Sequence, residues 1–251
     1  MEVPEPDIII HAWYPRGVKR VIASGSNSFI GLIDENTVLK YPQLPLEKPP
    51  GQLIGLGVEE QIFGVLGQHR RIIGFLGKHE EGLLLEHMPN GSAAEYLYNA
   101  DPQPPIQERL EWALQAAEAV AYIHTKRVIH CDVSAGNLLF DKDLNVKLCD
   151  FQGRLLHPDG TIHLNGDSAE GTDIFALGSA IYFIIKGHPP FPELDPWKDE
   201  LEIVSRFKER QFYALNWVPG GDVVKKCWAG DYESADEVVH DLRNSTTSNR
   251  G

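Results

Sequence analysis

The stretch that decides the fold reads VIHCDVSAGNLLFDKDLNVKLCDFQG and spans residues 128–153. Within it, two short apolar runs, Leu138–Phe140 and Val146–Leu148, flank a polar segment at residues 141–143. Apolar runs on both sides of a turn-forming segment are typical of a β-hairpin. Because a hairpin brings the chain back to where it started, we expect the polar residues before and after it to converge at one end.

Three side chains are predicted to meet there: Asp132, Asn137 and Asp150. Carboxylate and amide oxygen atoms are the ligands that divalent cations prefer, which suits Asn137 and Asp150. Asp132 can orient a hydroxyl group or accept its proton. A single Asp or Asn in a loop commonly only caps a turn. The complete set at this spacing favours a metal-dependent reaction on a hydroxyl group.

The composition argues against several classes of function. The chain has 251 residues, with 23 basic and 36 acidic side chains and a net charge of −13. This acidic excess argues against binding to nucleic acid or to an anionic membrane surface, because both need a basic face. The three cysteines, Cys131, Cys149 and Cys227, show no C-x-x-C spacing, so we expect neither a disulfide framework nor a zinc cluster.

Targeting signals and membrane spans are not expected either. The N-terminal sequence MEVPEPDIII lacks the positive charge of a signal peptide. The most apolar stretch, residues 174–185, has twelve residues and is too short to cross a bilayer. We therefore expect a soluble protein of the cytoplasm with reduced cysteines.

The apolar pattern divides the chain into two parts and predicts an α+β fold with a cleft between them. Up to residue 85 the sequence favours strands and one helix, and from residue 104 onward it favours helices. The predicted strands are residues 18–23, 31–34, 37–41, 72–76 and 82–85, with a turn at 34–36 and a loop at 42–57. The predicted helices are residues 58–66, 107–124, 172–186, 199–212 and 234–243, followed by a disordered tail at 244–251.

These features resemble protein kinases. Residues 128–153 are similar to the catalytic and metal-binding loops of that family, H-R-D-x-x-x-x-N followed by D-F-G. The resemblance covers roughly residues 18–243, and its wording is most like that of small divergent fungal kinase-like proteins. The other matching motifs are a glycine-rich loop at Gly25–Ile30, a V-A-I-K-like strand at Thr37–Lys40, a hinge at Leu85–Met88, a D-x-W-S-x-G-like helix start at Thr172–Gly178, a G-x-x-P-F-like ending at Gly187–Phe191 and K-C-W at Lys226–Trp228.

The resemblance implies a two-lobed protein-kinase-like fold in a single domain at residues 18–243, with an N-lobe at about 1–85 and a C-lobe at about 86–243. It implies an enzyme that uses ATP and Mg²⁺ and transfers the γ-phosphoryl group to a serine or threonine hydroxyl of a protein substrate. By the same resemblance, the catalytic residues are Lys40, Glu59 and Asp132, the ATP-binding residues are Gly25, Lys40, Glu86, Met88, Asn137 and Asp150, and the metal ligands are Asn137 and Asp150.

Helical periodicity selects the carboxylate that pairs with Lys40. Glu59 lies three residues before Ile62 and four before Phe63, so it shares their buried face. Its neighbour Glu60 points about 100° away around the helix. We therefore predict Glu59 as the partner of Lys40.

Several departures from the family pattern bear on activity. Asn27 and Ile30 stand where two further glycines are expected, so the backbone would approach phosphate groups less closely. Cys131 replaces the arginine that in the family pairs with a phosphate on the activation loop, which predicts activity without switching by loop phosphorylation. Gln152 replaces the glycine of D-F-G, and Ser134 replaces a phosphate-binding lysine.

The activation segment is also short. Only 22 residues separate Asp150 from Asp173, and no A-P-E motif is present. Two alternatives therefore stand beside the kinase prediction: a pseudokinase that acts as a nucleotide-binding or interaction module, and a small-molecule phosphotransferase of the aminoglycoside or choline kinase kind. The sequence does not name the substrate or the oligomeric state, and it does not decide between serine, threonine and tyrosine as acceptors.

Overall fold

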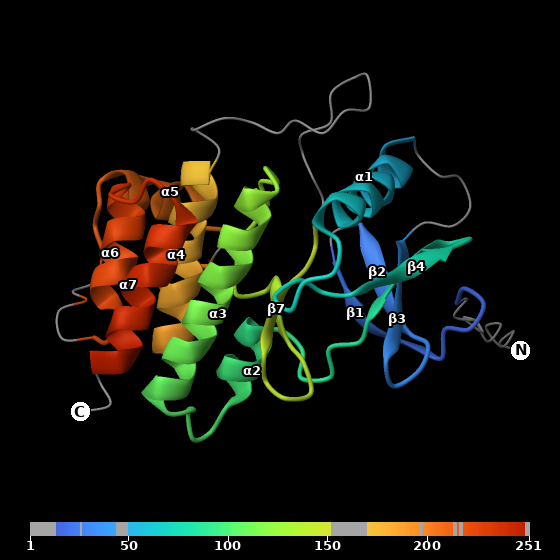
Figure 1. Ribbon diagram of the computed structural model, residues 1–251, viewed down its shortest axis with the longest axis horizontal. Coiled ribbons are helices and arrows are strands. Elements are labelled where there is room, and N and C mark those ends of the chain that lie inside the picture. Colours follow the sequence, from blue (N-terminus) through green and yellow to red (C-terminus); the bar gives the residue numbers. More distant parts are fainter. Residues whose placement is uncertain are drawn as a thin grey trace, which may run out of the picture.

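The structure is a computed structural model that describes residues 14–25, 27–43, 50–151, 170–195, 198–212, 215 and 218–248. A sheet with one helix forms an N-terminal lobe, a group of helices forms a C-terminal lobe, and a small hairpin lies between them (Figure 1). This is the two-lobed α+β architecture that the sequence predicts.

Five antiparallel strands form the sheet of the N-lobe. They are β1 (Arg20–Ser24), β2 (Ser28–Leu32), β3 (Thr37–Pro42), β4 (Phe75–His79) and β5 (Gly82–Glu86). Their spatial order is β1-β2-β3-β5-β4, so β3 lies at the centre of the sheet. Residues 38–41 of β3 are all buried, which places Lys40 inside the lobe.

The turn between β2 and β3 lies where the sequence predicts it, and Asp34 Oδ1 accepts the N–H of Asn36 there at 2.9 Å. The predicted starts of β2 and β4 are wrong, because these strands begin at Ser28 and Phe75. Residues 71–73 do not enter the sheet, since they run beside the hairpin between the lobes and hydrogen-bond to it.

Helix α1 (Pro50–Leu66) packs on the sheet of the N-lobe (Figure 1). The predicted loop at 42–57 is wrong from residue 50 onward. Pro50 is tolerated in the first turn, where its missing N–H has no helical partner to lose. Four glycines in α1 lower its helix propensity, so burial of side chains such as Leu56 and Val58 stabilises it instead.

Six helices build the described part of the C-lobe. They are α2 (Ala93–Asn99), α3 (Ile106–Thr125), α4 (Glu170–Lys186), α5 (Glu200–Lys208), α6 (Gly221–Ala229) and α7 (Ala235–Ser248). The sequence predicts α3, α4, α5 and α7, although α5 ends earlier than predicted, and it misses the short helices α2 and α6. Helix α7 continues to Ser248, so residues 244–248 are helical and not part of a disordered tail.

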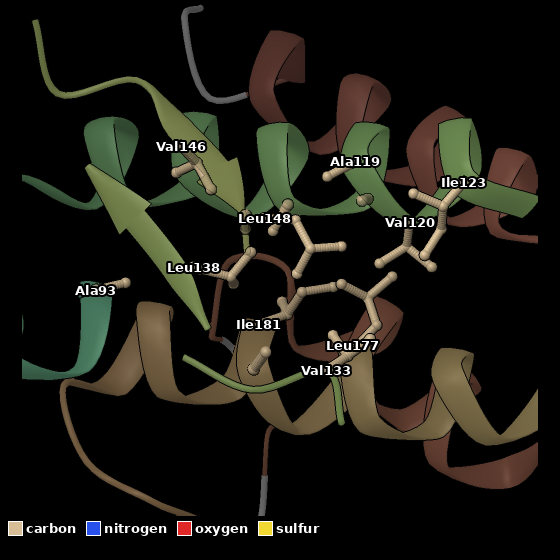
Figure 2. Packing of buried hydrophobic residues seen from close by; sticks show 14 of the residues in the cluster. Ala93, Ala119, Val120, Ile123, Val133, Leu138, Val146, Leu148, Leu177 and Ile181 are labelled. Atoms are coloured by element: carbon tan, nitrogen blue, oxygen red, sulfur yellow. The ribbon is translucent and has the colours of Figure 1, made fainter. Parts of the chain in front are cut away.

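Helix α3 packs against both α4 and α7 in the C-lobe. Figure 2 shows Val120 and Ile123 of α3 facing Leu177 and Ile181 of α4. All four side chains are buried, and together with the alanines of α3 they allow the helices to approach closely. Within the described ranges, no helix is both long and apolar enough to cross a membrane.

The predicted hairpin is present and consists of β6 (Leu138–Phe140) and β7 (Val146–Leu148). Leu138, Val146 and Leu148 of the hairpin are fully buried in the core beside α3 and α4 (Figure 2), whereas Leu139 is only half-buried. Beyond the last strand pair, the N–H of Cys149 donates to the carbonyl of Asn137 at 3.0 Å. The loops before and after the hairpin therefore lie side by side, as the sequence predicts.

The glycines of α1 give a test of its stability. Gly64 is exposed, and a Cβ atom there would meet nothing within 4 Å. We expect Gly64→Ala to raise the free energy of unfolding by about 0.5–1 kcal/mol, because alanine loses less backbone entropy in a helix. The measurement is urea denaturation.

Gly67→Ala is the matched control for this substitution. Gly67 follows the helix with φ +63°, a conformation that strains an L-residue, so this variant should be less stable than the wild type. Equal effects of the two variants would contradict the assignment of α1 as a helix weakened by Gly64.

Candidate active site

A buried ion group joins three segments of the chain. Lys40 Nζ, on β3, lies 2.7 Å from Glu59 Oε2 on α1 and 2.5 Å from Asp150 Oδ1 after β7. Lys40 is 5% exposed and Glu59 is 1% exposed. Glu60 instead binds Lys78 at the surface, at 2.8 Å. The structure thus brings together Lys40, Glu59 and Asp150, which the sequence predicts as site residues.

The charge on Lys40 depends on these two carboxylates. Burial alone would lower the pKa of Lys40, but Glu59 and Asp150 together hold that pKa above its ordinary value. The ammonium group therefore stays charged at neutral pH. A charged group so deep in the protein is stable only while its partners stay in place.

The segment before Asp132 is hydrogen-bonded to α4. The carboxylate of Asp173, fully buried on α4, accepts the N–H groups of His130 and Cys131, both at 2.8 Å, and lies 3.1 Å from His124 Nε2. These bonds fix a backbone in which Cys131 has φ 65°, a conformation uncommon for a non-glycine residue. Asp173 therefore sets the position of the loop that carries Asp132.

The side chains of Asp132 and Asn137 contact each other across that loop. Asn137 Nδ2 donates to the backbone carbonyl of Asp132 at 2.8 Å and to its Oδ2 at 3.1 Å. These bonds fix the amide of Asn137, so that its oxygen and not its nitrogen remains for a ligand. The predicted neighbours therefore lie at one end of the hairpin, next to the ion group.

Phe151 links the ion group to the loop before Asp132. Its N–H donates to Glu59 Oε1 at 3.2 Å, and its ring packs edge-on against Phe63 of α1 at 5.5 Å and against His130 at 5.1 Å between ring centres. His130 Nε2 in turn lies 2.8 Å from the carbonyl of Cys149. Both lobes therefore contact one buried aromatic side chain.

A cavity of about 310 Å³ opens between the lobes above this group. Its apolar walls come from the sheet, the segment after β5 and the hairpin, and its polar end holds Lys40, Asn137 and Asp150. The predicted nucleotide-binding residues Gly25, Glu86 and Met88 also line it. All predicted site residues except Asp132 therefore line this cavity, and Asp132 lies at its edge through its contact with Asn137.

The carboxylate of Glu86 is engaged by protein groups. It accepts Lys147 Nζ at 2.7 and 2.9 Å and the N–H of Gly74 at 3.0 Å. Any contact of Glu86 with a ligand would therefore use its main chain. The sequence analysis missed Lys147, although the apolar residues on either side of it in β7 already place its side chain on the opposite face.

Cys149 lines the cavity next to Asp150. Burial, together with the neighbouring charge of Asp150, raises the pKa of its thiol above the ordinary value. A thiol that keeps its proton is a poor nucleophile. The Cys149 thiol is therefore less reactive than that of an ordinary exposed cysteine.

The donor atoms at the polar end fit a divalent cation. Asn137 and Asp150 offer one amide and one carboxylate, which are hard oxygen ligands of the kind that Mg²⁺ takes. Among the described residues, no cluster of three or more His, Cys, Asp or Glu side chains forms a complete metal site. These two residues would therefore share the ion with oxygen atoms of a phosphate ligand or of water.

Two predicted features cannot be placed. Gln152 and the short activation segment fall within residues 152–169, outside the described residues. Ser134 lies in the loop before the hairpin, where its carbonyl accepts the N–H of Asn137 at 3.0 Å.

Comparison with known proteins finds a family match over the middle of the chain. Residues 55–155 match the family described as protein tyrosine and serine/threonine kinase. The chain is 32% identical over 160 residues to an L-type lectin-domain containing receptor kinase of Arabidopsis thaliana, covering 53% of this chain and 24% of that protein. It is 36% identical over 126 residues to an Aurora kinase of Candida glabrata, covering 44% and 35%. A serine/threonine-protein kinase-like protein of Arabidopsis thaliana is 39% identical over 95 residues, covering 37% and 28%.

The chain spans about a quarter to a third of the length of these curated relatives. Residues 55–155 are therefore similar to a protein kinase domain, in agreement with the predicted resemblance over that part of the chain. The finer resemblance to small divergent fungal proteins is not supported, because plant receptor kinases are prominent among the relatives.

The role of Asp173 can be tested by Asp173→Asn. An amide offers one acceptor oxygen and directs its NH₂ group at a backbone donor, so one buried N–H loses its partner. We expect a loss of about 2–4 kcal/mol in the free energy of unfolding, measured by denaturant titration.

The exposed Asp231→Asn is the matched control, with an expected change within about 0.5 kcal/mol. If Asp173→Asn were as stable as this control, Asp173 would not hold the loop.

Proposed function

We propose that this chain is a protein kinase that binds Mg-ATP and transfers the γ-phosphoryl group to a serine or threonine hydroxyl of a protein substrate. The observation that carries the proposal is the ion group of Lys40, Glu59 and Asp150, assembled at the polar end of one cavity beside Asn137 and Asp132. The two-lobed fold and the kinase-domain match of residues 55–155 support the same function.

The cavity offers each part of ATP a suitable contact. Ile22, Val38 and Leu139 line it and would sandwich the adenine ring between apolar side chains. Met88 lines the same cavity, and its main-chain N–H would bind a ring nitrogen. Lys40 would bind the phosphate groups, since its ammonium group already lies at the polar end.

The transfer step uses positioning and charge compensation. Asp132 orients the acceptor hydroxyl and takes its proton as the hydroxyl oxygen bonds to the γ-phosphorus atom, while the bond from that atom to the oxygen of ADP breaks. Asn137 and Asp150 would hold Mg²⁺, which would supply positive charge to the phosphate oxygen atoms. Glu59 keeps Lys40 in place throughout.

A pseudokinase is the second candidate, and the loop between β1 and β2 favours it. Ile30 lines the cavity where the family has a glycine, so its side chain takes up space close to the phosphate groups. Such a protein would bind a nucleotide or a partner without useful turnover. The complete set of Lys40, Asp132, Asn137 and Asp150 argues for turnover. Helix α4 holds the Asp132 loop through Asp173. The sequence at the start of this helix resembles protein kinases, which favours a protein kinase over a small-molecule phosphotransferase.

Turnover can be tested with Asp132→Asn. We expect the wild type to transfer the γ-phosphoryl group from Mg-ATP to a generic basic protein, and we expect this variant to lose about 10²–10⁴-fold in rate because it removes the general base. Its affinity for Mg-ATP, measured by the shift in melting temperature, should stay close to that of the wild type.

Asp143→Asn, at the exposed tip of the hairpin, is the matched control and should keep full activity. A melting-temperature shift with no transfer by the wild type would establish the pseudokinase. The absence of both the shift and the transfer would remove the proposal altogether.

The proposal also predicts activity without phosphorylation of the chain. Cys131 carries no positive charge to bind a phosphate, and Asp173 already fixes the loop of Asp132 through backbone N–H groups. We expect the transfer rate to stay unchanged when the protein is treated with a broad-specificity phosphatase and the phosphatase is removed before the assay. A rate that falls with this treatment and recovers on autophosphorylation would contradict the prediction.

A further inference from the structure

The loop between β1 and β2 is tied to a residue that the sequence analysis did not single out. Gln43 directly follows β3, and its N–H donates to the carbonyl of Asn27 at 3.2 Å. Its side-chain Nε2 donates to the carbonyl of Gly25 at 2.5 Å. A bond from the N–H of Gly25 to the carbonyl of Ser28, at 2.8 Å, closes the loop itself. Gln43 therefore holds the loop at two points.

Glycine conformations do not determine the shape of this loop. The φ of Gly25 lies outside the left-handed region, and a Cβ atom there would meet only the carbonyl of Ser28, at 3.8 Å. Asn27 and Ile30 carry side chains where the kinase pattern has glycines. The loop therefore needs other interactions to fix its position, and the two bonds from Gln43 supply them.

We propose that Gln43 is a positioning residue that holds the β1–β2 loop over the phosphate groups of the bound nucleotide. Gly25 and Ser28 line the same cavity as Lys40. In a planar trans peptide the C=O and N–H groups point in opposite directions. The peptide that directs the carbonyl of Asn27 toward Gln43 therefore directs the N–H of Ser28 away from Gln43. Backbone N–H groups held in this way are effective donors to phosphate oxygen atoms.

Strand β3 thus serves the nucleotide at two points. It carries Lys40, whose ammonium group lies at the polar end of the cavity, and it is followed by Gln43, which fixes the loop that lines the same cavity. Because the two residues are three apart on one short segment, the loop and the ammonium group have a fixed spacing. This inference rests on the proposed binding of ATP, and it assigns to Gln43 the positioning of the phosphate groups and not of adenine.

The test compares Gln43→Met with the wild type in titrations with Mg-ATP and with adenosine, by calorimetry and without any turnover. Methionine has nearly the same length as glutamine but has no side-chain N–H, so this variant loses the bond to Gly25 and keeps the backbone bond to Asn27. We expect the affinity for ATP to fall by about three- to tenfold, the equivalent of one hydrogen bond, and the affinity for adenosine to stay unchanged. Gln61→Met, on the exposed face of α1, is the matched control and should bind both ligands as the wild type does.

Three outcomes would overturn the inference. Unchanged ATP affinity in Gln43→Met would show that the side-chain bond from residue 43 to the carbonyl of Gly25 does not matter for phosphate binding. Equal losses for ATP and adenosine would show a general disturbance of the cavity. If the wild type bound no ATP, both the inference and the proposed function would fall, whereas the first two outcomes leave the proposed function intact.

Discussion

The rest of the structure depends on the pairing of one buried ammonium group. Lys40 lies at the centre of the sheet, where burial disfavours its charge, and two carboxylates compensate it. Glu59 comes from α1 and Asp150 from the segment after the hairpin, so this requirement fixes the helix and the C-lobe against the same strand. These three charged side chains form the polar end of the cavity without any bound ligand.

A chain of contacts extends from this group through the molecule. Glu59 accepts the N–H of Phe151, the ring of Phe151 packs on His130, and the N–H of His130 donates to Asp173 on α4. The loop of Asp132 is thus connected to α1 through buried side chains, and not through the surface. Because protein interiors are closely packed, a shift of α1 would displace that loop as well. The geometry around Asp132 and the charge at Lys40 are therefore one structural unit.

The sequence predicts the parts of this unit that local patterns define. Two apolar runs around a polar turn identify the β6–β7 hairpin, and helical spacing selects Glu59 over Glu60 as the residue on the buried face of α1. The start of α1 and the contacts of Lys147 and Gln43 could not be predicted, because they depend on tertiary packing. Glycines at 51, 55 and 57 argue locally against a helix. Only the burial of α1 against the sheet overrides that preference.

A double-mutant cycle on Lys40→Met and Glu59→Gln tests the central claim most directly. The free energy of unfolding of the wild type, the two single variants and the double variant would be measured by denaturant titration without ligand. If the buried pair holds α1 against the sheet, the effects of the two substitutions are coupled by about 1–3 kcal/mol. Either substitution alone already breaks the interaction between Lys40 and Glu59, so the second substitution has less left to remove. Effects that add to within about 0.5 kcal/mol would contradict the account.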